Sequence, residues 1–316
     1  MEIFLKKEIS LNESQYIWKD GALVAWHEAT THVLSHTLHY GNSVFEGVRA
    51  YPTKRGLAIF RLEAHTKRLL DSAKIVAINC PFSFEELCKA QIDILNANDF
   101  SGKESVYLRP LIYLGYGSMG IAHWNAPVHT IVACWEWGNY LGEGSLKEGI
   151  KVKTSSFRRN SANSSLSKAK VAANYLNSQM ARYEAHLCGF QECLLLDENG
   201  MVAEGSGECI FIIKDKVLIT PPWDNTLKSI TQESVIALAK AEGLEVVQRH
   251  ITRDEVYSAD EAFFVGTAAE IVPINELDFR KIGDKKPITH FLQEKFFSLV
   301  RGEDERFSHY LTYIKE

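Results

Sequence analysis

The sequence predicts an α+β fold divided into two domains. Its 316 residues exceed the size at which a single hydrophobic core usually stops growing, about 250 residues. Segments with strand-like alternation are interrupted by segments with helical periodicity, without the regular βαβ alternation of a doubly wound sheet. A glycine-rich stretch, GNYLGEGSLKEG, separates two such groups. We therefore expect a smaller N-terminal α+β domain over 1–137, a connecting loop over 138–149 and a larger C-terminal domain over 150–316.

In the N-terminal domain, short strands are expected over 16–61, because apolar runs are separated there by turn residues. Helical periodicity follows at 63–76. The tetrapeptide SFEE at 83–86 has the spacing of a capping box and marks the start of a second helix. Two further strands are expected near 105–113 and 128–137.

The C-terminal domain is expected to combine several strands with three helices. Turn signals such as Asn199-Gly200 separate the short apolar runs that indicate strands. The strands are expected near 150–155, 193–197, 201–204, 208–213 and 217–219. The helices are expected near 170–188, 230–242 and 285–300.

Two lysines lie at the start of the expected 170–188 helix. Lys168 belongs to a polar loop, whereas Lys170 stands at the junction of loop and helix, from which a side chain can point into a cleft. A single lysine is usually exposed to solvent, so the residues alone make neither lysine catalytic. Apolar residues then recur at helical spacing, and we expect the face that they form to be buried. This stripe consists of Leu176, Met180, Tyr183 and Leu187.

Composition and charge limit the possible partners. The 35 basic and 40 acidic side chains give a net charge of −5, which offers no excess positive charge to a nucleic acid or an anionic membrane. The N-terminus lacks the order of regions found in secretory signals, and no apolar run approaches roughly 18 residues. The six cysteines form no CxxC pair, as is typical of reduced thiols. We expect a cytoplasmic protein that acts on small molecules.

Two other patterns suggest sites that we do not favour. His32, His36 and His39 would share one face of a helix, as a metal site requires. No carboxylate completes a helical zinc motif there, and Gly41 would end the helix, so we expect no metal. The segment 115–120 matches GxGxxG, but the residues after it lack helical periodicity, which favours a loop over a dinucleotide site. A metalloenzyme and a nucleotide-binding module remain the alternatives from other classes.

Five separated blocks, spread over nearly the whole chain, carry a family resemblance. They are HYGNSVFEGVRAY at 39–51, VYLRPLIYLGYGSMG at 106–120, AKVAANYLNS at 169–178, EGSGECIF at 204–211 and GTAAEI at 266–271. In sequence and in order they resemble the branched-chain aminotransferases, which are pyridoxal-phosphate enzymes of fold type IV. The resemblance implies the two-domain fold of the D-amino-acid-aminotransferase type.

The same resemblance implies an activity and a cofactor. The activity is reversible transfer of the amino group from L-leucine, L-isoleucine or L-valine to 2-oxoglutarate, giving the branched-chain 2-oxo acid and L-glutamate. The cofactor is pyridoxal 5'-phosphate. D-amino-acid transaminase and aminodeoxychorismate lyase, which share the fold, are the alternatives within it.

By this resemblance Lys170 holds pyridoxal phosphate as an imine and moves the substrate's proton, while Lys168 is an ordinary loop lysine. Near a cationic cofactor and away from bulk water, we expect the protonated form of Lys170 to be disfavoured. The resemblance assigns Glu204 to the cofactor's ring nitrogen. It assigns Tyr175 to the cofactor's phenolic oxygen.

A phosphate site is expected at the start of the 230–242 helix. The tetrapeptide SITQ at 229–232 has the spacing of a capping box, and free N–H groups at a helix start favour an anion. The resemblance implies that the phosphate is held by Arg61, the backbone of Ile230 and Thr231, and the hydroxyl of Thr267.

The resemblance also implies a substrate pocket that serves both apolar and charged side chains. Its apolar wall is formed by Tyr40, Phe45, Trp137 and Tyr140, with Gly47 beside it. The α-carboxylate is taken by Tyr107 and by the backbone at Thr267 and Ala268. Arg109 is the natural partner of the distal carboxylate of glutamate or 2-oxoglutarate. Its alternative is a structural arginine bound to a nearby carboxylate.

The family's sites borrow residues from a neighbouring subunit. By resemblance Tyr40 and the loop around Ile121 reach across, so we expect a homodimer or a higher homo-oligomer. Three places depart from the family's common pattern, with Ala172-Ala173 in place of Gly-Gly, Ser229 in place of Gly and Cys209 in place of Asn.

Overall fold

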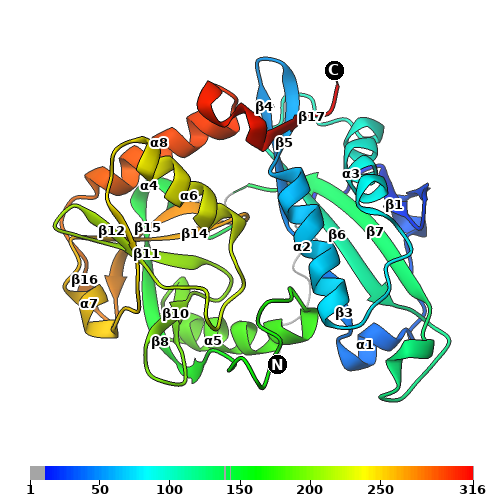
Figure 1. Cartoon of the computed structure of the whole chain (residues 1–316), viewed down its shortest axis with the longest axis horizontal. Helices are drawn as coiled ribbons and strands as arrows, with labels where there is room; N and C mark the ends of the chain where they lie inside the picture. The colour runs from blue at the N-terminus through cyan, green and yellow to red at the C-terminus, as the bar shows by residue number, and fades with distance from the viewer. Residues whose placement is uncertain (1–10, 139, 143, 316) are drawn as a thin grey trace, which may run out of the picture.

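Two β-sheets, each covered by helices, organise the chain, as Figure 1 shows. This computed structural model describes residues 11–138, 140–142 and 144–315. Residues 1–10, on which part of the expectation of no secretory signal rests, lie outside this description, as do residues 139, 143 and 316. The separate sheets and their helices confirm the predicted α+β class.

The first sheet has the strand order β17-β5-β4-β6-β7-β1-β2, with β3 paired to β6, and the pairings given for it are antiparallel. Its strands are β1 (Tyr16–Lys19), β2 (Ala22–Ala25), β3 (Ser43–Phe45), β4 (Val48–Thr53), β5 (Gly56–Phe60), β6 (Val106–Leu114), β7 (Val128–Glu136) and β17 (Leu311–Tyr313). The helices of this half are α1 (His36–Tyr40), α2 (Leu62–Ile75) and α3 (Phe84–Ala97), with short 3-10 helices at Trp26–Glu28 and His123–Asn125.

The second sheet mixes parallel and antiparallel pairs in the order β10-β9-β8-β15-β14-β11-β12-β13, with β16 paired to β15. Its strands are β8 (Ile150–Arg158), β9 (Glu192–Leu196), β10 (Val202–Glu204), β11 (Cys209–Lys214), β12 (Val217–Thr220), β13 (Val246–Gln248), β14 (Glu261–Gly266), β15 (Glu270–Leu277) and β16 (Arg280–Lys281). The helices of this half are α4 (Ser145–Glu148), α5 (Tyr175–Leu187), α6 (Ile230–Ala241), α7 (Arg253–Tyr257) and α8 (Pro287–Val300), with 3-10 helices at Ala172–Asn174 and Glu305–Tyr310.

The longer helices begin and end close to where the sequence places them. The expected capping box opens α3: the Ser83 hydroxyl accepts from the backbone N–H of Glu86 at 3.2 Å, and the Glu86 carboxylate accepts from the backbone N–H of Ser83 at 2.7 Å. The helix expected to start at residue 170 starts instead as a 3-10 turn, and its α-helical part begins at Tyr175.

The end of the chain returns to the first sheet. After α8, β17 pairs with β5 beside the red C-terminus in Figure 1. One buried cluster joins Phe60 and Leu311 of the first sheet to Phe211 and Phe263 of the second. A division of the chain at one linker therefore assigns β17 to the wrong half. This strand packs with the N-terminal half, because its apolar side chains complete the shared core.

The buried face of α5 is not the one that the sequence predicts. The buried residues of this helix are Ser178, Ala181 and Ala185, which pack over the cluster that contains Phe190. The expected stripe instead points outward, with Leu176 65% exposed and Leu187 68% exposed. Small residues recur at the same helical period, and their face lets the helix approach β8 and β9 closely. Periodicity alone does not distinguish the two faces.

Two further observations bear on environment and partners. Within the described residues, the helices fall short of the length and apolar character that crossing a membrane requires. All six cysteines are free thiols.

Candidate active site

A cavity lies between the two sheets, and both halves of the chain line it. Twelve of the residues singled out in the sequence contribute to its wall. They are Phe45, Gly47, Tyr107, Arg109, Trp137, Tyr140, Lys170, Tyr175, Glu204, Ile230, Thr267 and Ala268. Segments that are far apart in the sequence thus meet at one place.

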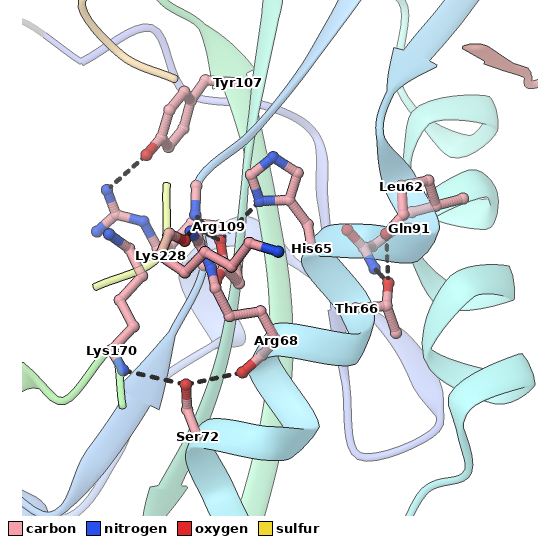
Figure 2. Close-up of polar contacts among 12 residues, drawn as sticks. Leu62, His65, Thr66, Arg68, Ser72, Gln91, Tyr107, Arg109, Lys170 and Lys228 are labelled. Atoms are coloured by element: carbon pink, nitrogen blue, oxygen red, sulfur yellow. Dashed lines mark hydrogen bonds and ion pairs between the residues drawn. The ribbon is translucent and has the colours of Figure 1, made fainter. Parts of the chain in front are cut away.

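Lys170 is anchored on three sides. Its ammonium group lies 2.7 Å from the hydroxyl of Tyr175. Its backbone N–H donates to the Ser72 hydroxyl at 3.0 Å, and its carbonyl accepts from the backbone N–H of Phe45 at 3.1 Å. Figure 2 shows Ser72 between Lys170 and the backbone of Arg68, to which the Ser72 hydroxyl donates at 2.7 Å. Helix α2 therefore fixes the position from which the amine enters the cavity.

Lys168 has a different environment. Its ammonium group donates to the backbone carbonyls of Trp223 and Thr226, the latter at 3.0 Å. It does not line the cavity that contains Lys170. The two lysines are thus separated in space as the sequence analysis separates them in role.

Neighbouring residues change the pKa of Lys170. Burial lowers the pKa of the Lys170 amine, but the neighbouring Tyr175 and the carboxylate of Glu46 outweigh burial and raise this pKa above its ordinary value. Glu46, a fully buried carboxylate, is a contribution that the sequence did not indicate. The expectation that a cationic cofactor disfavours the protonated amine stays a prediction.

Arg61, expected at the phosphate, does not reach the cavity. Its guanidinium donates to the Ser234 hydroxyl at 3.0 Å and to the Glu233 carboxylate at 2.7 Å. Arg68 lines the cavity instead. The signal that could have distinguished the two is helical spacing, because Arg68 lies one turn before Ser72 on the face of α2 that meets Lys170.

The start of α6 has the expected cap but not the full box. The Ser229 hydroxyl accepts from the backbone N–H of Gln232 at 3.1 Å. The side chain of Gln232 donates to Thr220 at 2.6 Å instead of returning to Ser229. The N–H groups of Ile230 and Thr231 fall in the first turn, where a helix has no internal acceptors for them. Ile230 lines the cavity, whereas Thr231 is buried behind it.

Glu204 forms a buried ion pair inside the cavity. Its carboxylate lies 2.5 Å from Nε of Arg159. Burial raises the pKa of Glu204, and the positive charges of Arg159 and Lys170 oppose this rise without cancelling it. Arg159 was not identified from the sequence, where it is one of two adjacent arginines at the end of a strand.

Arg49 joins the two halves of the molecule directly behind the cavity. Its side chain is 3% exposed and makes five hydrogen bonds. The acceptors are the carbonyls of Thr267 (2.9 Å), Ala268 (2.9 Å), Trp137 (3.2 Å) and Gly138 (3.3 Å) and the hydroxyl of Ser105 (2.7 Å). In a trans peptide the N–H points away from the preceding carbonyl. The bond to the Thr267 carbonyl therefore turns the N–H of Ala268 away from Arg49, and Ala268 lines the cavity.

Arg109 is a cation among aromatic rings. Its Nη2 donates to the Tyr107 hydroxyl at 3.2 Å, and its guanidinium lies 4.8 Å from the centre of the Phe45 ring. Its Nε is buried without a hydrogen-bond partner. Within residues 11–138, 140–142 and 144–315, no carboxylate forms an ion pair with it, which disfavours the structural alternative.

The cavity is also lined by Glu208, which no pattern in the sequence indicated. Burial raises the pKa of its carboxyl group to about 8, helped by the nearby carboxylate of Glu192 and opposed by the N–H of Gly207 and by Arg182. Arg182 in turn contacts the hydroxyl of Tyr140, an expected wall residue. No motif in the sequence marks this group, because its members come from a loop and two separate elements.

Tyr40 and Ile121, expected to serve a neighbouring subunit, lie outside the cavity of their own chain. The Tyr40 hydroxyl accepts from the backbone N–H of Gly120 at 3.1 Å, and Ile121 is 90% exposed. Their roles at a partner's site stay a prediction.

Of the three clustered histidines, His36 and His39 lie on α1, whereas His32 lies before this helix. Helix α1 begins at His36, whose Nε2 lies 2.7 Å from the carbonyl of Gly120, and Nε2 of His39 lies 2.9 Å from the carbonyl of Val33. No group of three or more potential metal ligands occurs in the part of the chain that the structure describes. The segment 115–120 is a loop, as predicted.

These features agree with the comparisons to known proteins. The model of the amino-transferase class IV family matches residues 43–277, and the chain belongs to this family. A branched-chain-amino-acid aminotransferase of Pseudomonas aeruginosa is 50% identical over 301 residues, covering 95% of this chain and 97% of the relative.

Solved structures give the same result. The Escherichia coli branched-chain amino acid aminotransferase has a TM-score of 0.93 at 40% identity, covering 96% of this chain and 100% of that chain. The branched-chain amino acid aminotransferase from Thermobaculum terrenum, solved in its PLP-form, has a TM-score of 0.89 at 35% identity, covering 96% and 99%. The family and the fold type implied by the five sequence blocks are confirmed.

The first prediction concerns Arg49. Replacing Arg49 with Lys leaves three donors on a flexible stem for five acceptors. We expect the free energy of unfolding to fall by about 3 kcal/mol and KM to rise for leucine and 2-oxoglutarate alike, because both carry an α-carboxylate. Denaturant titration and steady-state kinetics measure these effects. The matched control is Arg55→Lys on the same hairpin, which is exposed. A folded Arg49→Lys variant with unchanged KM values would contradict the proposed link to Ala268.

The second prediction concerns Glu208 and pH. A carboxyl group whose pKa is raised from 4.5 to about 8 on folding binds its proton more tightly in the folded state. Its contribution to stability is complete below pH 4.5 and is lost as the pH rises to about 8. As the pH rises from 4.5 to about 8, the free energy of unfolding of the wild-type protein should fall by roughly 1–4 kcal/mol more than that of Glu208→Gln. Urea titrations of both proteins at several pH values test this, and parallel pH profiles would refute it.

Proposed function

We propose that the protein transfers the amino group of L-leucine, L-isoleucine or L-valine reversibly to 2-oxoglutarate, with pyridoxal 5'-phosphate as cofactor. The products are the branched-chain 2-oxo acid and L-glutamate. The observation that carries the proposal is the amine of Lys170, held against Tyr175 in a cavity shared by both halves of a class IV aminotransferase. The two alternatives within the fold are not favoured, because relatives at 41–50% identity are named for branched-chain substrates.

The residues that line the cavity fit this cofactor. Arg68 and the first turn of α6 supply a cation and free N–H groups for a phosphate. Glu204 supplies a buried carboxylate for a ring nitrogen, and Tyr175 a hydroxyl for the phenolic oxygen. When bound, pyridoxal phosphate supplies an aldehyde for an amine and a conjugated ring that accepts the electrons released with the substrate's α-proton.

Lys170 has two tasks in this scheme. Its amine holds the cofactor. Once free, the amine takes the α-proton from one face of the bound substrate and returns a proton from that same side. Tyr175 and Glu46 favour the ammonium form of Lys170. The Tyr175 hydroxyl, 2.7 Å away, is the group placed to accept this hydrogen bond and to keep the amine oriented.

The remaining wall serves the substrate. Phe45, Trp137 and Tyr140 supply apolar surface for a branched side chain, with Gly47 leaving room beside Tyr107. A Cβ at Gly47 would lie 1.9 Å from the Tyr107 hydroxyl, so only glycine allows Tyr107 its position. The Tyr107 hydroxyl and the N–H of Ala268 are proposed to bind the α-carboxylate.

The active form is proposed to be a homodimer or a higher homo-oligomer. Val33, Leu38, Tyr116, Ile121 and Trp124 form an exposed apolar surface around α1 and the 115–124 loop, and Trp124 is 73% exposed. Helix α5, which carries the exposed stripe, lies along the same lower edge of the molecule as α1 in Figure 1. Such an extensive apolar surface is unusual for a monomer. A second copy of this chain would cover it and bring Tyr40 and Ile121 to a neighbouring cavity. The proposed location is the cytoplasm, which the free thiols favour.

The third prediction tests the assignment of the lysine. Lys170→Ala should abolish transamination and the visible absorption of the bound cofactor, because the amine that binds it is lost. Lys168→Ala, the matched control from the same loop, should keep most of the activity. Spectra recorded before and after addition of L-leucine measure both effects. Comparable losses in the two variants would contradict the assignment.

The fourth prediction tests Arg109 as the partner of the distal carboxylate. Arg109→Met keeps an apolar side chain among the rings but removes the charge. Catalytic efficiency with 2-oxoglutarate should fall by about tenfold or more, equivalent to ~1.4 kcal/mol, while the leucine half-reaction changes far less. Single-turnover rates with each substrate measure this. Equal losses would make Arg109 a structural residue.

The fifth prediction concerns assembly. Sedimentation at assay concentration should give a dimer or a larger species for wild-type protein. Ile121→Lys should weaken both the assembly and the activity, because a charge replaces an apolar side chain in the interface. Lys54→Ala, on an exposed turn far from this surface, is the control. A fully active monomer would refute the proposal.

A further inference from the structure

Behind Arg68, the buried side chains of Glu46 and His65 form with it one connected group. The Glu46 carboxylate accepts from Nε of Arg68 at 2.6 Å, from Nη2 of Arg68 at 2.8 Å and from Nδ1 of His65 at 2.7 Å. Glu46 is completely buried, and His65 is 1% exposed. Figure 2 shows His65 and Arg68 on consecutive turns of α2, on the side that faces Lys170.

Burial and the neighbouring charges act in opposite directions on this group. Burial alone would raise the pKa of Glu46, but Arg68 and His65 outweigh it and hold this pKa well below the ordinary value. Burial lowers the pKa of His65, against the effect of Glu46, so its ring is neutral. The neutral ring donates its Nδ1–H to the carboxylate. The charges of Glu46 and Arg68 therefore cancel, and the group as a whole carries no net charge.

The bonds to Arg68 leave a defined part of its guanidinium free. An arginine has five N–H donors in one rigid plane. Two of them go to Glu46, and a third, on Nη1, goes to the carbonyl of Lys228 at 2.7 Å. Two N–H donors remain, one on each Nη. Lys228 directly precedes the cap of α6, so these donors lie next to the helix start that offers its own N–H groups.

The position of Glu46 in the chain also separates it from the substrate. Glu46 stands between Phe45 and Gly47, which line the cavity, and successive residues of an extended chain point to opposite sides. Its backbone N–H donates to the carbonyl of Pro110 at 2.9 Å, which fixes it against β6. Glu46 therefore acts from behind the cavity wall.

We propose that Glu46, supported by His65, is a positioning residue for phosphate recognition: it fixes the plane of Arg68 so that two N–H donors meet the phosphate at the start of α6. This inference rests on the proposed binding of pyridoxal phosphate. It makes phosphate recognition depend on the orientation of donors more than on unpaired charge. The opposite view is that Glu46 merely neutralises Arg68, in which case removing its charge should strengthen phosphate binding.

The test compares two ligands that differ only in the phosphate. The dissociation constants of pyridoxal phosphate and pyridoxal are measured by titrating cofactor-free protein. The dissociation constant of pyridoxal divided by that of pyridoxal phosphate is the phosphate ratio, which falls when the phosphate contributes less to binding. In Glu46→Gln this ratio should fall by about tenfold, which corresponds to ~1.4 kcal/mol, while pyridoxal binds about as in wild type. A ratio equal to or above the wild-type value would overturn the proposal.

A matched variant separates positioning from general destabilisation. Glu261 is also a buried carboxylate, and it accepts the backbone N–H groups of Ile288 and Thr289 at the start of α8. Glu261→Gln should lower the free energy of unfolding but leave the ratio unchanged. A similar fall of the ratio in Glu261→Gln would show that any buried defect suffices, and would also overturn the proposal.

Two more variants complete the test. Arg68→Gln should remove most of the phosphate contribution; if it does not, the proposed phosphate role of Arg68 fails. If Arg68→Gln has this effect and Glu46→Gln does not, only the positioning role fails. Should Glu46→Gln not fold, His65→Phe is measured instead. It removes the hydrogen bond to Glu46 and should lower the ratio by about threefold, and an unchanged ratio would refute the proposal.

Discussion

The arrangement of the cavity depends on one buried side chain, Arg49. Its five N–H donors are all used, and their acceptors lie just before β6, just after β7, in the connecting loop and in the turn between β14 and β15. A buried cation without acceptors would cost several kcal/mol, so these segments must stay together for Arg49 to remain inside. The two halves are thereby held at a fixed separation, and Ala268 is turned toward the substrate. Tyr51, which donates to Glu270 at 2.8 Å, adds a second contact between the halves at the same place.

Helix α2 has the corresponding role at the other side of the cavity. Its Ser72 holds the backbone of Lys170, and its Arg68 approaches the start of α6 through the carbonyl of Lys228. One rigid element thus sets the positions of an amine and of an anion-binding group that are about 100 residues apart in the sequence. This geometry needs a helix with a buried polar face. Such a face is stable only when each of its polar groups has a partner, and Glu46 provides the partner for both Arg68 and His65.

The sequence predicted the α+β class, the longer helices, the cap of α6 and twelve residues of the cavity wall. Most of these depend on local patterns or on family blocks. It failed where the answer depends on which way a side chain points. Arg61 caps the start of α2 and Arg68 lies in the middle of this helix, and only packing shows that Arg61 turns to Glu233. The apolar stripe on α5 has helical periodicity and was expected to be buried, but it is exposed, because the small residues of the opposite face pack against the sheet. Arg49, Arg159 and Glu208 act through distant partners, which no spacing in the chain reveals.

The cavity has to accept an uncharged branched side chain and a carboxylate in the same place. An unpaired carboxylate in an apolar pocket costs several kcal/mol, whereas a strongly hydrated pocket would not gain from burying methyl groups. The structure combines both properties, because Arg109 lies over the ring of Phe45 at 4.8 Å with its Nε lacking an acceptor. Aromatic faces stabilise the guanidinium when no carboxylate is present. An incoming carboxylate can then pair with a cation that has no competing acidic partner, while a leucine side chain meets the same rings. Charge and apolar surface are thus provided by neighbouring groups, and neither substrate requires the pocket to be rebuilt.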